Sequence, residues 1–253
     1  MSDPTNLPTI AEIEAATEVL SMPDNSAKVV RVNEHFAIKF GNGIPLSEAE
    51  SMKLLAANSK VPVPKVYKAF VDTETNRTFI IMEYVHGDNL QKLLPSLTPT
   101  QKAIICKLPY YDGVFWTKDY NPLIFGPFAS QREINHGILE RLRQTEPPQY
   151  IRLLENMVDS TLHDHRTVFT HGDLQPKNIM VDEVESFEDG SSSFKITLID
   201  WELAGWYPEY WDFCNATISC RFKPDWLEFI PDILDVYPLE YLMMQVVYSS
   251  VIY

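Results

Sequence analysis

Two polar segments, each placed at the end of an apolar strand-like run, constrain the fold of this chain more than any other feature. Residues 169–181 read FTHGDLQPKNIMV, so Asp173 and Asn178 lie on one tight loop between two short runs. Further along, the run FKITLI of residues 194–199 ends in Asp200. Asp and Asn often serve only to stabilise turns. Three oxygen-bearing side chains in this order instead favour a common site.

The chemistry that suits such a site is phosphoryl transfer from a nucleotide. It needs Mg²⁺ to bridge the phosphates, oxygen ligands for the metal, and an acceptor for the hydroxyl proton. Asn178 and Asp200 can supply oxygens to the metal, and Asp173 can accept the proton.

The first third of the chain predicts a small antiparallel sheet with one helix. Residues 28–32 and 35–40 are predicted to be strands, and residues 47–58 repeat apolar side chains at helical spacing, with Ser47 and Glu50 resembling a capping box. Two more strands are expected within 61–71 and 77–85; the second is a continuous apolar run, typical of a strand buried on both faces.

From Thr98 onward the pattern changes to helices, with Thr98 as the N-cap and Pro99 as the first helical residue. The acidic, Gly/Ser-rich stretch 182–193 is expected to be a loop between two short strands. We therefore predict an α+β fold of two lobes: an N-terminal sheet-rich lobe of residues 1–86 and a larger, mostly helical lobe of residues 87–253.

Composition limits the classes of partner. The 253 residues carry a net charge of −14, which disfavours binding to nucleic acid or to an anionic membrane surface. The N-terminus lacks a basic stretch followed by an apolar core, and no apolar run is long enough to span a bilayer. Three unpatterned cysteines indicate neither a disulfide framework nor a zinc site. We expect a soluble, cytoplasmic protein.

The motif H-G-D-x-x-x-x-N of residues 171–178, followed by I-D-W-E at 199–202, resembles the aminoglycoside phosphotransferase and choline kinase family, small-molecule relatives of the protein kinases. The segments GPF at 126–128 and IDWELAGWYPEYWDF at 199–213 are similar to the fungal branch of that family. The likeness runs from about residue 26 to residue 224 and implies a protein-kinase-like two-lobe fold.

The resemblance also implies roles for individual residues. Asp173 would orient or deprotonate the acceptor hydroxyl, and Asn178 and Asp200 would hold Mg²⁺. Lys39, on the strand HFAIKF, would contact the α- and β-phosphates of ATP. Glu50, on the following helix, would form the ion pair of Lys39 and is preferred to Glu48.

The nucleotide would meet two further segments of the smaller lobe. Met82 would lie beside the adenine, and the backbone of Glu83 and Val85 would hydrogen-bond its edge. No G-x-G-x-x-G precedes Lys39. The loop that contains Asn25 and Ser26 would have to cover the phosphates instead.

Three alternatives are weighed against these roles. Asp212 resembles a structural aspartate that ties the catalytic loop to the next helix. Glu202 either faces the substrate or is a surface carboxylate. An aromatic cluster could cage a quaternary ammonium by cation–π contacts, although core packing is the stronger interpretation; its members are Trp201, Trp206, Tyr207, Tyr210 and Trp211.

The predicted activity is ATP- and Mg²⁺-dependent phosphoryl transfer to a hydroxyl of a small molecule. The excess of acidic residues favours a cationic acceptor, such as an amino alcohol, aminoglycoside or amino sugar. A protein kinase is disfavoured because no D-F-G or A-P-E follows Ile199. A catalytically impaired nucleotide-binding module is the other candidate. The sequence does not predict an oligomeric state.

Overall fold

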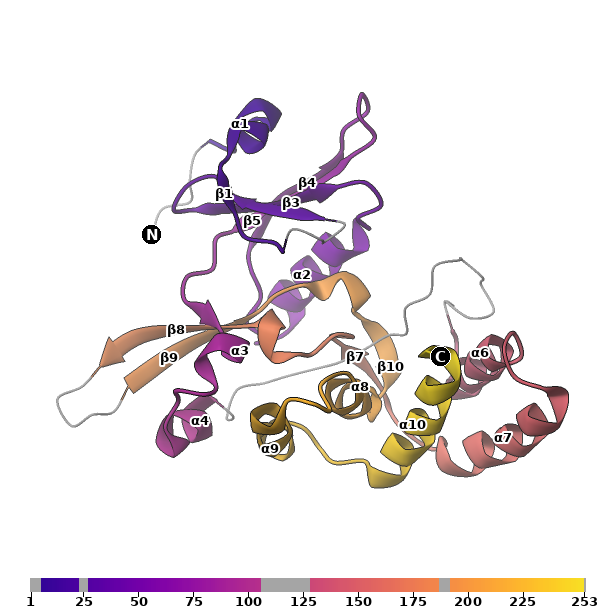
Figure 1. Cartoon of the computed structure of the whole chain (residues 1–253). Helices are drawn as coiled ribbons and strands as arrows, with labels where there is room; N and C mark the ends of the chain where they lie inside the picture. The colour runs from indigo at the N-terminus through magenta and orange to yellow at the C-terminus, as the bar shows by residue number, and fades with distance from the viewer. Residues whose placement is uncertain (1–5, 23–26, 106–127, 187–191, 253) are drawn as a thin grey trace. The chain divides into compact units, whose positions relative to one another are not determined.

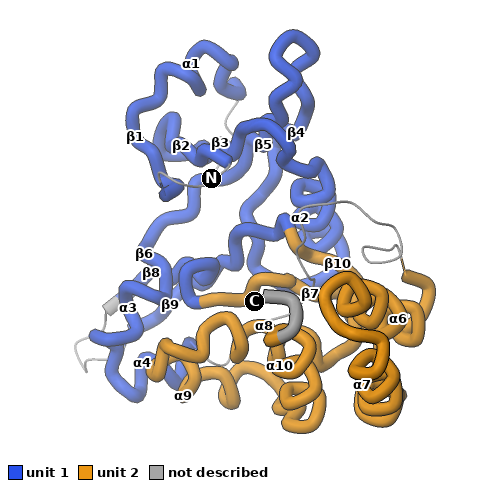
Figure 2. The backbone as a smooth tube through the Cα atoms, turned by 45° about the vertical axis from the view of Figure 1, so that its right-hand side comes forward, with its two compact units in different colours: residues 1–105, 176–202 blue, residues 106–175, 203–253 orange. Residues whose placement is uncertain are grey.

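The structure, a computed structural model, describes residues 6–22, 27–105, 128–186 and 192–252 (Figure 1). It has the α+β composition that the sequence predicts. Contacts divide the chain into two units (Figure 2): unit 1 comprises residues 1–105 and 176–202, and unit 2 comprises residues 106–175 and 203–253. The division into lobes at residues 86 and 87 stays a prediction. Each unit is described by itself below.

A five-stranded antiparallel sheet forms the centre of unit 1, with the strand order β1-β2-β3-β5-β4. Four of the five strands, β2 to β5, fall in the segments that the sequence patterns indicate. Their bounds are β1 Glu18–Val19, β2 Lys28–Arg31, β3 Phe36–Gly41, β4 Val66–Val71 and β5 Thr78–Glu83.

A helix lies on each face of this sheet, as Figure 1 shows for α1 (Ile10–Ala15) and α2 (Ser47–Asn58). Side chains alternate along a strand, so one face of β3 presents Phe36 and Ile38, which pack with Ile13 of α1. The intervening Lys39 points to the side of α2, where it meets Glu48. Burial on both faces explains why β5 reads as a continuous apolar run.

The expected capping box of α2 is wrong. The helix begins at Ser47 as predicted, but its N-cap is Leu46 and no side chain caps it. The first turn is therefore not closed by Ser47 and Glu50. Instead, the backbone amide of Glu48 donates a hydrogen bond to the carbonyl of Pro45, and the backbone amide of Glu50 donates one to the carbonyl of Leu46.

A second, three-stranded sheet of unit 1 has the order β6-β8-β9. It joins β6 (Asp88–Asn89) to the hairpin of β8 (Ile179–Ser186) and β9 (Ser192–Leu198). The strands are longer than predicted, because the acidic stretch pairs across the hairpin, as in Asp182 opposite Lys195. Two helices complete the unit: α3 Leu90–Leu93 and α4 Pro99–Ile105. Thr98 precedes α4, and its hydroxyl accepts from the amide of Gln101 as an N-cap does.

In its described residues, 128–175 and 203–252, unit 2 is mostly helical and contains one two-stranded sheet, β10-β7. Its elements are α6 Gln131–Leu142, α7 Pro148–Thr161, β7 Thr167–Thr170, β10 Gly205–Pro208, α8 Trp211–Ser219, α9 Pro224–Ile233 and α10 Pro238–Ile252. The apolar α10 packs on α6, α7 and α8 and buries Met243, Met244 and Val247. Among the described residues, no helix combines the length and apolar character needed to cross a membrane.

Candidate active site

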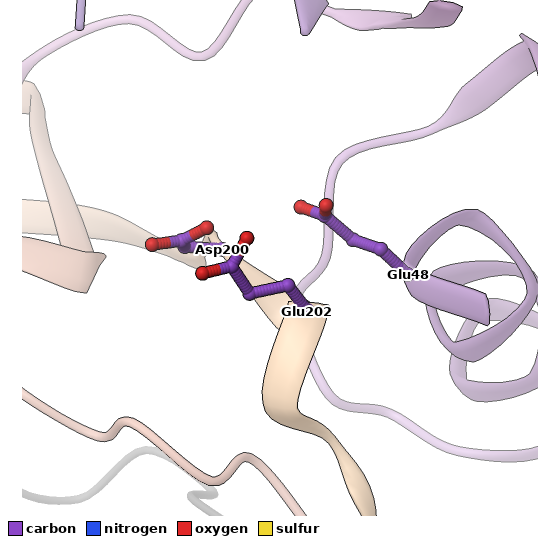
Figure 3. Close-up of side chains that lie close together, drawn as sticks. All are labelled: Glu48, Asp200 and Glu202. Atoms are coloured by element: carbon purple, nitrogen blue, oxygen red, sulfur yellow. The ribbon is translucent and has the colours of Figure 1, made fainter. Parts of the chain in front are cut away.

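The ammonium group of Lys39 joins three carboxylates from distant parts of unit 1. Lys39 is 5% exposed on β3. Its Nζ lies 2.9 Å from Oε2 of Glu48 on α2, 2.8 Å from Oδ1 of Asp200 and 2.9 Å from Oε2 of Glu202. Figure 3 shows the three carboxylates turned toward one another.

The partner of Lys39 on α2 is Glu48, so the prediction of Glu50 is wrong. Each residue advances a helix by about 100°, which places Glu50 well around the helix from Glu48. Glu48 shares the buried face with Ala49, Met52 and Leu55, and Glu50 is exposed. The apolar stripe of the helix was the sequence signal that could have distinguished the two glutamates.

Asn178 and Asp200 lie at the same end of the β8–β9 hairpin. Asn178 immediately precedes β8, and Asp200 follows β9 after one residue. The register pairs Ile179 with Leu198, and the amide of Ile199 donates to the carbonyl of Asn178 at 3.0 Å. The hairpin therefore brings together two residues that are 22 positions apart in the sequence.

Asp200 has a backbone conformation that non-glycine residues rarely adopt. Its φ is +68°. Such left-handed residues cost free energy and concentrate at functional sites, where the surrounding structure holds them. Here the indole Nε1 of Trp201 donates to the carbonyl of Leu198 at 2.8 Å and fixes the turn on either side of Asp200. The strained turn directs the Asp200 carboxylate to Lys39.

Charge in this cluster is unbalanced. Burial lowers the pKa of the Lys39 ammonium, but the attraction of Glu48, Asp200 and Glu202 outweighs it and raises the pKa, so Lys39 stays charged. Burial raises the pKa of Glu48 to about 7, against the lowering effect of Lys39. With all groups ionised, three carboxylates and one ammonium leave a charge of −2.

The donor set fits a divalent cation. One oxygen from each of Glu48, Asp200 and Glu202 lies within 4.8 Å of the others. Carboxylate oxygens are the ligands that Mg²⁺ prefers, and its charge would balance the excess. Glu202, which the sequence left between substrate contact and surface charge, bonds to Lys39; its D-x-E spacing from Asp200 after a strand was the available signal.

The residues expected beside the adenine lie at the end of β5. Met82, Glu83 and Val85 are each half-buried. The amide of Glu83 donates to the carbonyl of Lys65 at 2.8 Å, which leaves its carbonyl as the group that could face a base. No hydrogen bond within the described residues uses the Val85 amide. Asn25 and Ser26 lie outside the described residues.

Asp173 belongs to unit 2 and follows β7. The chain enters it through His171, which is fully buried, and Gly172, whose φ is +94°. The Asp173 amide donates to Nδ1 of His171 at 3.2 Å, and the side-chain amide of Gln175 donates to Oδ1 of Asp173. His171 thus holds the backbone of Asp173, and Gln175 holds its half-buried carboxylate.

Asp212, at the start of α8, is buried as expected but makes no tie to the loop. It is 3% exposed, and neither carboxylate oxygen has a hydrogen-bond partner among the described residues. Its side of α8 borders a cavity of about 320 Å³ in unit 2, together with Arg166, Glu209 and Tyr237. The predicted bracing contact is therefore wrong.

The aromatic residues after Asp200 pack mainly in the interior. Trp201, Tyr210 and Trp211 are at most 1% exposed, and Tyr207 stacks on Trp211 with ring centroids 5.0 Å apart. Core packing is thus confirmed for these four. Trp206 differs, because it is 62% exposed.

The fold resembles that of solved aminoglycoside phosphotransferases. A protein from Ralstonia eutropha provisionally classed as one aligns with 94% of this chain and 82% of its own, at a TM-score of 0.56 and 17% identity. The enzyme APH(4)-Ia, solved with ADP and hygromycin B, aligns with 96% of this chain and 90% of its own, at 0.53 and 14%. A phosphotransferase solved with GDP and kanamycin aligns with 94% of this chain and 85% of its own, at a TM-score of 0.53 and 16% identity.

These likenesses show that the chain has the protein-kinase-like fold that the resemblance implied. The model of the phosphotransferase enzyme family matches residues 45–242. The chain belongs to this family. A comparison with curated proteins finds no match.

Proposed function

We propose that this protein transfers the γ-phosphoryl group of ATP to a hydroxyl of a small molecule, with Mg²⁺. One observation carries the proposal: the Lys39 ammonium bonds the Asp200 carboxylate, although the two residues are 161 positions apart. To bind a nucleoside triphosphate with its metal, a protein needs a lysine for the phosphates and carboxylates that can hold the metal.

The roles follow from the chemistry of each group. Asp200 and Asn178 hold Mg²⁺, with Glu202 as a further oxygen donor, and the metal neutralises charge on the phosphates. Lys39 contacts the phosphates, with Glu48 holding it in place. Asp173 orients the acceptor hydroxyl and takes its proton. The backbone of Glu83 and Val85 meets the adenine edge beside Met82, and Asn25 and Ser26 cover the phosphates.

Two substitutions separate the metal from the base. General-base assistance is typically worth about 10² to 10⁴ in rate, whereas losing a metal ligand removes charge neutralisation and positioning together. We expect Asp200→Ala to abolish turnover and Asp173→Asn to retain a measurable rate of turnover. Both rates are compared in a coupled assay of ADP release. If the Asp173→Asn enzyme were as active as the parent, Asp173 would not be the group that takes the proton of the acceptor hydroxyl.

The acceptor is sought with a panel of amino alcohols, aminoglycosides and amino sugars. Acceptor-stimulated, Mg²⁺-dependent consumption of ATP is the expected result. A cationic acceptor is favoured because residues 203–253 contain two basic and seven acidic residues. Tight binding of Mg-ATP without turnover across the panel would instead indicate a nucleotide-binding module.

A further inference from the structure

Trp206 is an exposed aromatic residue on the small sheet of unit 2. On β10, Tyr207 turns to the interior and stacks on Trp211, so the alternation of the strand directs Trp206 to the opposite face. There its ring meets Phe169 of β7 edge-on, with centroids 5.4 Å apart and planes at 77°. The register places the two residues directly opposite each other.

This aromatic pair, Trp206 and Phe169, lies one register pair from the end of β7, and Asp173 follows on the loop after β7. The next register pair is Gly205 with Thr170, and the Thr170 hydroxyl donates to the Gly205 carbonyl at 2.6 Å. Asp173 follows Thr170 by three residues, which span at most about 11 Å. A small molecule whose hydroxyl approached Asp173 would therefore have the aromatic pair within reach.

Trp206 is exposed, so a cation from outside the protein can reach its ring. Elsewhere the protein covers rings with its own cations: Arg31 lies 4.1 Å from the ring centroid of Tyr84, and Arg221 lies 4.8 Å from that of Phe222. Within the described part of the chain, no such cation covers Trp206.

Charge in this region also favours a cation. Arg166, just before β7, is already bound by Glu209 at 2.6 Å. The segment that carries Trp206 is strongly acidic, as noted above. Tryptophan offers the most favourable ring for a cation.

We propose that Trp206, supported by Phe169, binds the ammonium group of the phosphoryl acceptor and so determines acceptor specificity. This inference rests on the proposed function, in that it takes Asp173 as the group that meets the acceptor hydroxyl. The ammonium group would sit on the indole face while the hydroxyl extends toward Asp173.

Binding is tested without turnover by ¹H–¹⁵N NMR of the tryptophan indole groups. The Trp206 signal is assigned as the one missing from Trp206→Phe. Tetramethylammonium chloride at millimolar concentration should shift this signal, whereas sodium chloride at equal ionic strength and tert-butanol, an uncharged compound of similar size, should not. No shift with tetramethylammonium, or an equal shift with tert-butanol, would overturn the proposal.

Specificity is tested with whichever amino alcohol, aminoglycoside or amino sugar the wild-type protein phosphorylates. Trp206→Ala should raise KM for that acceptor about tenfold and leave KM for ATP unchanged. Phe222→Ala, the matched control, removes another exposed ring of unit 2 and should change neither. An unchanged acceptor KM in Trp206→Ala would contradict the proposal. If the wild type phosphorylates none of them, the proposed function fails and the NMR titration alone decides the cation site.

Discussion

Lys39 is buried in unit 1, and burial alone would favour its neutral form. Three carboxylates within 2.9 Å of its Nζ keep it charged. Glu48 is the buried member of the three, whereas Asp200 and Glu202 are partly exposed. Glu48 therefore anchors Lys39 toward α2, and the two exposed carboxylates stay accessible to a metal.

We expect Glu48→Gln to lower kcat/KM for ATP by about tenfold to a hundredfold. Without the Glu48 charge, Lys39 would be drawn to Asp200 and Glu202 and away from the phosphates, and small displacements of positioning groups cost up to about 10² in rate. The measurement is steady-state kinetics together with calorimetric affinity for Mg-ADP.

The matched control is Glu50→Gln, the same substitution on the exposed side of the same helix. It should behave as the wild type in both measurements. Equal losses in the two variants would restore the assignment that the sequence alone favoured.

The choice between Glu48 and Glu50 shows what the local sequence pattern predicts and what depends on packing. The position of Lys39 on a strand followed from the apolar, strand-like run HFAIKF. Which glutamate it meets depends on how α2 is rotated against the sheet. That rotation is set by burial of Ala49, Met52 and Leu55, an apolar stripe that the sequence contains but that acquires its direction only when α2 packs against the sheet.

At the scale of elements, the β8–β9 hairpin joins unit 1 through β6. Asp88 and Asn89 pair with Val181 and Met180, across some 90 residues of sequence. The chain enters β6 through Gly87, whose φ is +93°. A Cβ built there would lie 2.1 Å from the carbonyl oxygen of Val181, so only glycine allows this approach.

Gly87→Ala should destabilise the protein by more than about 2 kcal/mol. It adds a clash with backbone of β8 to the cost of a left-handed alanine, which is about 1–2 kcal/mol. Urea unfolding followed by circular dichroism measures the loss.

Gly43→Ala separates the two contributions. Gly43 also has a positive φ, +73°, but an added Cβ would meet nothing within 4 Å. Its variant should show the conformational cost alone. If both variants lost the same stability, close packing of Gly87 on β8 would not be the reason for a glycine at that position.

The extent of the hairpin was underestimated from composition. Apart from Val184, residues 182–186 and 192–193 are acidic or small and polar, which is typical of a loop, yet they belong to β8 and β9. Ladder bonds and cross-strand partners, such as Glu183 with Ser192, compensate for weak strand propensity. Partners on another strand are not visible in a composition window.

At the scale of the whole molecule, stability should fall above pH 10. Burial raises the pKa of Tyr207 to about 12 and that of Tyr210 further, from about 10 in an unfolded chain. Between pH 10 and 12 the unfolded state loses these protons while the folded state keeps them, so stability present below pH 10 is lost as the pH rises.

For Tyr210, which is fully buried, the loss approaches about 1 kcal/mol per pH unit. Urea unfolding of the wild type and of Tyr210→Phe at pH 8 to 11 measures it. The variant should lose less stability per pH unit above pH 10 than the wild type. Identical slopes would show that Tyr210 ionises as easily in the folded protein as in the unfolded one.

The sequence by itself determined the α+β class, the kinase-like family, the sheet of unit 1 and the loop ends that carry Asp173, Asn178 and Asp200, because each depends on local alternation, turn residues and motif spacing. Only the tertiary structure decided that Glu48 meets Lys39, that Glu202 joins them, that Asp212 is buried with no hydrogen-bond partner among the described residues, and that Trp206 alone of the aromatic cluster is exposed. These outcomes depend on how elements rotate and pair across long stretches of chain, and that is governed by burial of surfaces that no single segment contains.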